Sequence, residues 1–139
     1  MKYKIIGKYI KDLNFSIPNP KIFFLLSKNI SNYKINIDIN SNQIKQNIIE
    51  VLTSLTLSPS TNDFEKINTK IVFATIVELS NENIDKKEIE SIVLIKVPSQ
   101  IYGELRKIFI NLFENSGFKD IKISENIDFK KLHDMRKTQ

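Results

Sequence analysis

The chain has 139 residues, of which 41% are hydrophobic and 27% charged, a composition typical of one folded domain and not of a disordered chain. It contains no cysteine, which excludes disulfides, thiolate chemistry and cysteine-based zinc sites. The formal net charge of +5 would suit nucleic acid, but only two of the 21 basic residues are arginine, the side chain best suited to phosphate, so we expect no nucleic-acid partner.

The sequence has no evident segment for export or membrane insertion. The opening residues, MKYKIIGKYIKD, place only two or three apolar residues between lysines, where a secretory signal has about seven to fifteen. The most apolar run, residues 71–77, is far shorter than the roughly 20 residues that span a bilayer. We therefore expect a cytoplasmic protein with a single domain over residues 1–139 that does not insert into membranes.

The first segment in chain order, KYIKDLNFSIPNP (8–20), is an apolar stretch that ends at two prolines, Pro18 and Pro20. Proline biases the residue before it toward extended backbone. The run IFFLL (22–26) shows neither strand alternation nor a convincing helix start, so we expect a loop. Five bulky apolar residues in a loop either fill the domain's own core or line a groove for a partner.

Strand periodicity follows. Residues 33–40 alternate isoleucine with polar residues, residues 47–57 continue the alternation, and NSNQ (40–43) is expected to be the turn between them. Residues 66–79 form a strand pattern that is apolar on one side, and the middle of its other side is apolar too. We therefore expect both faces of this strand to be covered, by the chain itself or by another subunit. We expect residues 80–90 to form a charged loop and the β-branched run SIVLIKV (91–97) to be a fourth, buried strand.

After Pro98 the period changes to that of a helix. Ile101, Leu105, Ile108 and Leu112 share one helical face. Further apolar residues widen this face beyond what one sheet face can cover, which indicates an oligomer formed through this helix. We expect Gly117 to close the helix in a left-handed conformation. A short last helix should then follow, with Asp128 as its N-cap and Phe129, Leu132 and Met135 on one side.

The sequence offers little for catalysis. No hydrolase, metalloprotease or phosphate-binding motif occurs. His133 is the only histidine, has no second ligand type beside it, and is expected on the surface. Glu82, Asp85, Glu88 and Glu90 lie among lysines and are expected to be solvated. We therefore expect a protein that is not an enzyme and needs no metal or cofactor, and whose role is binding or assembly.

Four segments occur in the order found in one known family: YIKDLNFSIPNP (9–20), YKINIDINSNQ (33–43), VPSQIYGELRKIF (97–109) and GFKDIKISENIDFKKL (117–132). They resemble SecB, the bacterial protein-export chaperone; the first is similar to its N-terminal signature and the second to its second strand region. VPSQIYGELRKIF (97–109) resembles the segment in which a proline opens the long helix, with Arg106 a few residues in. GFKDIKISENIDFKKL (117–132) resembles the closing stretch, with Asp128 and Phe129 at the start of a last helix.

The resemblance implies an α+β fold: a four-stranded antiparallel sheet with residues 8–20 in the first strand, a long interface helix and a short C-terminal helix, assembled as a homotetramer, a dimer of dimers. It implies ATP-independent holding of unfolded preproteins in apolar grooves and their delivery to the SecA motor. The groove candidates are Phe15, Phe23, Phe24, Leu25, Leu26 and Tyr33. The oligomer-interface candidates are Thr69, Ile71, Phe73, Ile101, Leu105, Ile108 and Leu112.

The chain departs from the family where SecA is expected to dock. Asp12 matches one acid of that contact and is our candidate for it. Ser16 and Lys70 stand where acids are expected, and Asn68 where a leucine is usual. Gly103 stands where the family commonly has proline. The alternative is therefore a SecB-like chaperone dedicated to one client, such as an antitoxin.

Overall fold

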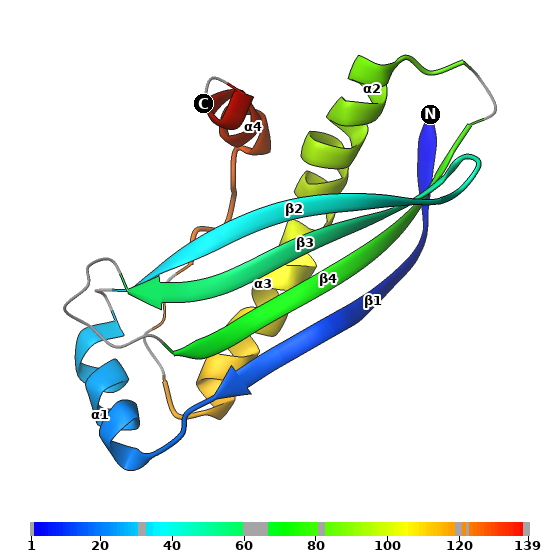
Figure 1. Ribbon diagram of the computed structural model, residues 1–139. Coiled ribbons are helices and arrows are strands. Elements are labelled where there is room, and N and C mark those ends of the chain that lie inside the picture. Colours follow the sequence, from blue (N-terminus) through cyan, green and yellow to red (C-terminus); the bar gives the residue numbers. More distant parts are fainter. Residues whose placement is uncertain are drawn as a thin grey trace.

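An antiparallel sheet of four long strands forms one layer of the protein, and a long helix crosses one of its faces (Figure 1). The computed structural model describes residues 2–30, 33–59, 67–80, 83–118, 121 and 123–137. The strands are β1 (Tyr3–Ser16), β2 (Tyr33–Lys45), β3 (Ile48–Pro59) and β4 (Asn68–Leu79), in the order β1-β4-β3-β2. The predicted fold class is confirmed, and β1 and β2 are the two edges of the sheet.

The hairpin between β2 and β3 turns later than predicted. Residues 40–43, expected to be the turn, are paired within β2, and the chain turns after Lys45. Asn47 adopts a positive φ of 66° there. Asparagine tolerates this left-handed conformation because its short side chain can bond to nearby backbone.

The prediction of a fourth strand at residues 91–97 is wrong. Residues 86–115 are one continuous helix made of α2 (Lys86–Ser91), a π-helical segment η2 (Ile92–Lys96) and α3 (Val97–Asn115). A short buried apolar run has no periodicity that separates strand from helix. The second half of the expected charged loop is also helical, because the Asp85 carboxylate caps α2 by accepting from the Glu88 N–H at 2.8 Å.

Pro98 lies inside this helix and does not open it. Proline has no N–H to donate to the carbonyl four residues back. Just before it the Val97 N–H reaches the Ile92 carbonyl, five residues back, which is the π-helical pattern. The Ser99 hydroxyl donates to the Ile95 carbonyl at 2.6 Å. The helix thus passes the proline with its backbone groups largely satisfied.

The predicted loop at residues 22–26 is also wrong, because it lies in helix α1 (Pro20–Asn29). The Asn19 side chain accepts from the Ile22 N–H at 2.9 Å, and Pro20 occupies the first turn. Asparagine at the N-cap followed by proline is a favoured helix start. The pair of prolines thus marks the entry into a helix.

The other two helix ends agree with prediction. Gly117, at φ 95°, follows α3, with N–H bonds from Gly117 to the Glu114 carbonyl (3.1 Å) and from Phe118 to the Phe113 carbonyl (2.9 Å). This pair of bonds is a Schellman motif. The last helix, α4 (Phe129–Lys137), begins where the Lys131 N–H donates to the Asp128 carboxylate at 3.0 Å.

The core between sheet and helix falls into two clusters. The larger contains Leu55, Ile71, Phe73, Ile101, Leu105, Phe109 and Phe113; the smaller contains Ile49, Val51, Val77, Leu79, Ile92, Val93 and Val97. Thr53 and Thr75, fully buried, lie between them along β3 and β4. Their hydroxyls have no hydrogen-bond partner among the described residues.

Candidate functional site

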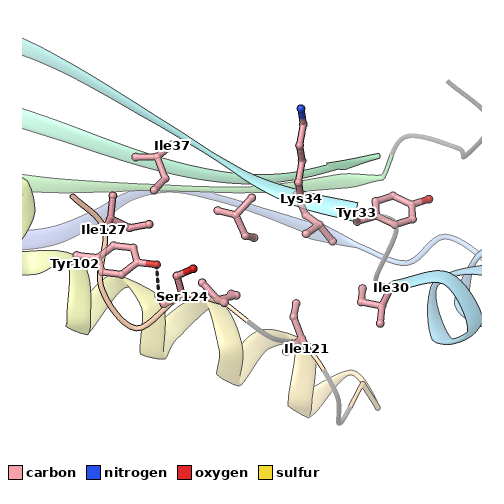
Figure 2. A pocket seen from close by; sticks show the side chains of 11 residues that line it. Ile30, Tyr33, Lys34, Ile37, Tyr102, Ile121, Ser124 and Ile127 are labelled. Carbon is pink, nitrogen blue, oxygen red and sulfur yellow. Dashed lines mark hydrogen bonds between the residues drawn. The ribbon is translucent and has the colours of Figure 1, made fainter. Parts of the chain in front are cut away.

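An apolar cavity of about 730 Å³ lies between β2, α3 and the segment that leads to α4 (Figure 2). Its lining is mostly aliphatic and includes two tyrosines. The lining residues are Ile30, Tyr33, Lys34, Ile35, Ile37, Leu57, Tyr102, Ile121, Ile123, Ser124 and Ile127. The Lys34 ammonium points away from the cavity in Figure 2, so that only the stem of this side chain contributes to the wall.

The wall opposite β2 is held by side chains of α3. The Tyr102 hydroxyl donates to the Ser124 carbonyl at 2.7 Å, and Arg106 Nε donates to the Ile123 carbonyl at 3.2 Å. Burial raises the pKa of Tyr102, which keeps its hydroxyl a neutral donor. These bonds satisfy carbonyl groups of a segment outside any helix or strand and fix its isoleucines toward the cavity.

The other wall ends in an unpaired strand edge. β2 pairs with β3 on one side only. In an antiparallel strand, the backbone groups of alternate residues point to opposite neighbours. The Ile37 carbonyl faces outward, because it accepts from Arg136 of α4 at 2.5 Å. The backbones of Ile35 and Ile39 therefore face the same outer side. An apolar cavity beside a sheet edge suits an extended peptide, which can add backbone hydrogen bonds and insert alternate side chains.

Of the six groove candidates, Tyr33 alone lines this cavity. Phe15 and Phe23 instead join an aromatic cluster that fastens β1 and α1 to the end of α3. Ring centroids are 5.0 Å apart for Phe15 with Phe113, and 5.0 Å for Phe23 with Phe118. Leu26 is fully buried in the core. Leu25 is half-buried, and Phe24 is 68% exposed on α1. Whether these residues contact a client stays a prediction.

Most of the cavity wall lies outside the residues predicted from the sequence to form a groove. The alternation of β2 places Ile35 and Ile37 on one side, but the partner wall comes from residues 121–127, almost 90 positions later. Ile121, Ile123 and Ile127 were the one signal, since three isoleucines close together outside a helix or strand must be covered by another part of the fold. Nothing in the sequence paired them with β2.

The interface candidates are mostly inside the protomer. Thr69, Ile71, Phe73, Ile101 and Leu105 are buried in its core, and Thr69 accepts from the Leu57 N–H at 3.3 Å. Ile108 and Leu112 on α3 are half-buried. Exposed apolar side chains that the prediction omitted lie on the edge strand β1, on both of its faces, at Ile6, Tyr9, Ile10 and Leu13, each 42–49% exposed. A role in assembly stays a prediction for all of these residues.

The face of the sheet opposite α3, here called the open face, carries the SecA candidate. Asp12 is exposed and pairs with Val72 across β1 and β4. Ser16 lies opposite Asn68, and Asn14 opposite Lys70. Other acids of the sheet are engaged in ion pairs, Glu78 with Lys4 at 3.4 Å and Asp38 with Arg136 at 3.6 Å. In the described part of the chain, Asp12 has no such pair.

Glu50, at 7% exposure, is the most buried acid of the open face. Its carboxylate accepts from the Tyr9 hydroxyl and, at 2.9 Å, from the Lys11 ammonium. These two hydrogen bonds, that of Tyr9 first, lower the pKa of Glu50. The group is therefore an internal tie between β1 and β3 and is not available to a partner.

No group of three or more metal-ligating side chains is found in the described ranges. His133, expected on the surface, is only 16% exposed, and its Nε2 lies 3.1 Å from Glu90 Oε1. This contact fastens α4 to α2. No helix among the described residues is long and apolar enough to cross a membrane.

Fold and cavity together define a class of protein: an α+β binding domain with an apolar cavity at a sheet edge. The family model described as "Preprotein translocase subunit SecB" matches residues 1–139. The chain therefore belongs to the SecB family of protein-export chaperones, which are not enzymes.

The relatives cover almost the whole chain. A protein of Pelagibacter ubique named "Putative protein-export protein SecB" is 42% identical over 134 residues, covering 96% of both chains. The protein-export protein SecB of Ehrlichia chaffeensis is 25% identical, covering 99% of this chain and 91% of its own. A solved SecB-like chaperone of Mycobacterium tuberculosis, in complex with a ChAD peptide from an antitoxin, superposes with a TM-score of 0.65. It is 12% identical and covers 91% of this chain and 88% of that one, which shows a shared fold.

Proposed function

We propose that this protein holds unfolded preproteins in the cytoplasm without ATP and delivers them to the SecA motor. The observation that carries the proposal is the apolar cavity of about 730 Å³ beside the outward backbone of β2. Each large client side chain buried contributes roughly 1.5–3 kcal/mol. Association costs roughly 4–15 kcal/mol, so several such contacts are needed and the net binding remains reversible.

Assembly belongs to the same proposal. We expect a homotetramer, a dimer of dimers, in which copies of the cavity lie on one particle and bind one long client together. The exposed apolar side chains of β1 and the half-buried Ile108 and Leu112 on α3 support this, because large apolar side chains on an edge strand and a helix favour contact with another copy.

A charged residue in the cavity wall tests the proposal. Ile35→Asp should weaken binding of an unfolded preprotein about tenfold or more, because a carboxylate replaces an apolar contact of the cavity. Ser41→Asp adds the same charge to β2 at an exposed position outside the cavity and serves as the control. Light scattering would follow suppression of preprotein aggregation without ATP, with circular dichroism to confirm folding. Equal suppression by wild type and Ile35→Asp would contradict the proposed site.

A chaperone dedicated to one client, such as an antitoxin, is the second candidate. It is favoured by the open face, where Asp12 is accompanied by Ser16, Asn68 and exposed Lys70 in place of a set of acids. The superposable Mycobacterium tuberculosis protein binds an antitoxin peptide. Affinity capture from the native cells, with purified SecA binding measured in parallel, separates the two. One dominant client and no SecA binding supports the dedicated role, whereas many precursors and SecA binding that Asp12→Lys weakens support export.

A further inference from the structure

Two cavities lie in succession along the outer edge of β2, and Arg136 stands where they meet. The large cavity includes Tyr33, Ile35 and Ile37. A second one, of about 170 Å³, is lined by Ile39, Leu94, Phe129, Leu132, His133 and Arg136. Ile37 and Ile39 are two positions apart on the same side of β2, so both cavities border one continuous strand edge.

Arg136 blocks that edge between the cavities. One guanidinium nitrogen donates to the Ile37 carbonyl at 2.5 Å, and the other lies 3.6 Å from the Asp38 carboxylate. An added strand would need this same carbonyl, because the backbone of Ile37 faces the unpaired side. The guanidinium and a client backbone therefore compete for one acceptor.

The remaining contacts of α4 do not depend on Arg136. Phe129 is 2% exposed and packs edge-on against Tyr102, with ring centroids 5.9 Å apart. His133 contacts Glu90 of α2. Arg136 lies in the last turn of α4 and its side chain is 44% exposed, so it can leave the edge while the helix stays docked.

We propose that Arg136 sets the length of client segment that the groove accepts, by capping β2 at Ile37 until a long client displaces it. This inference rests on the proposed function, since it concerns the same groove. From Tyr33 to Ile37 the free edge spans about 13 Å, room for a client segment of about five residues. Longer segments must break the Arg136 contact to reach Ile39 and the second cavity.

Labelled peptides of alternating leucine and threonine, about six and about twelve residues long, test the inference by fluorescence anisotropy. In Arg136→Ala the long peptide should bind about three- to tenfold more tightly than in wild type, the worth of one backbone hydrogen bond. The short peptide should bind both proteins equally. Hydrogen exchange at the Ile39 amide should slow with the long peptide, and more in the variant. Lys130→Ala, which removes the same charge from an exposed position of α4, should change neither affinity.

Two outcomes would overturn the inference, and only the second would also contradict the proposed client site. If wild type binds the short peptide and Arg136→Ala leaves the affinity of the long peptide unchanged, Arg136 does not limit client length and the proposed groove stands. If neither peptide binds any variant at the cavity, both the proposed client site and the role of Arg136 fall.

Discussion

At the scale of single residues, the least expected feature is the carboxylate of Glu50 on the open face. Strand alternation places it opposite α3, yet it is nearly as buried as the core. Tyr9 and Lys11 cover it from β1. These hydrogen bonds could not be inferred from the sequence. Glu50 is 41 residues from Tyr9 and 39 residues from Lys11, and β4 lies between β1 and β3 in the sheet.

Glu50→Gln should lower the free energy of unfolding by about 1 kcal/mol at pH 7, because a neutral amide makes weaker hydrogen bonds with Tyr9 and Lys11. The folded-state pKa of Glu50 lies below its ordinary value of 4.5, so its contribution is complete above that value and is lost as pH falls through the lowered pKa. Urea titrations should show the difference between wild type and variant shrinking as the pH falls below 4.5 and through the lowered pKa. A difference that stays constant over the whole acid range would contradict this account.

At the scale of elements, the sequence predicts some segments well for identifiable reasons. The alternation at 33–40, 47–57 and 66–79 marks β2, β3 and β4, and Gly117 and Asp128 mark two helix ends. Residues 91–97 were misassigned because a helix covered on several sides loses its polar stripe, and apolar runs then look alike in strand and helix. Residues 22–26 were misassigned because five residues span less than two helical turns, too few to show a helical period. The resemblance to SecB, and not periodicity, identified residues 8–20 as part of a strand.

The two glycines near α3 should respond oppositely to alanine. Gly117→Ala should destabilise the protein by about 1–2 kcal/mol, since φ is 95° and the added Cβ would lie 3.2 Å from the Phe23 ring. Gly103→Ala, inside α3 with open space around the new Cβ, should stabilise it by about 0.5–1 kcal/mol. Thermal unfolding of both variants provides the measurement. A gain in stability from Gly117→Ala would show that the Schellman end of α3 is not rigid.

At the scale of the whole molecule, the two edges of the sheet differ in character. β1 exposes large apolar side chains along its length, whereas the edge of β2 borders the cavity and is capped by Arg136. One edge suits a second copy and the other a client. The cavity was only partly foreseen, because its walls meet through the packing of α3 and not through any local pattern.

Leu13→Lys should therefore reduce the size of the assembly. The proposed tetramer has four times the 16.2 kDa mass of the chain, and a buried lysine in the β1 contact would carry an unpaired charge. Light scattering coupled to size exclusion measures the mass. Ile44→Lys, at a 53% exposed position of β2, is the matched control and should keep the full mass. Unchanged mass in Leu13→Lys would place the contact elsewhere.

The two threonines between the core clusters predict that the two ends of the protein open separately. Thr53 and Thr75 place hydroxyls without a hydrogen-bond partner, among the described residues, between the cluster next to η2 and the cluster that holds the aromatic rings. Native-state hydrogen exchange should resolve two opening free energies, one for each end. In the double variant Thr53→Val with Thr75→Val, the two apolar clusters should join into one. Both opening free energies should then rise and become equal. If the two values differ as expected, one end of the sheet would open while the other remains folded, which would leave the strand edge at the folded end in place.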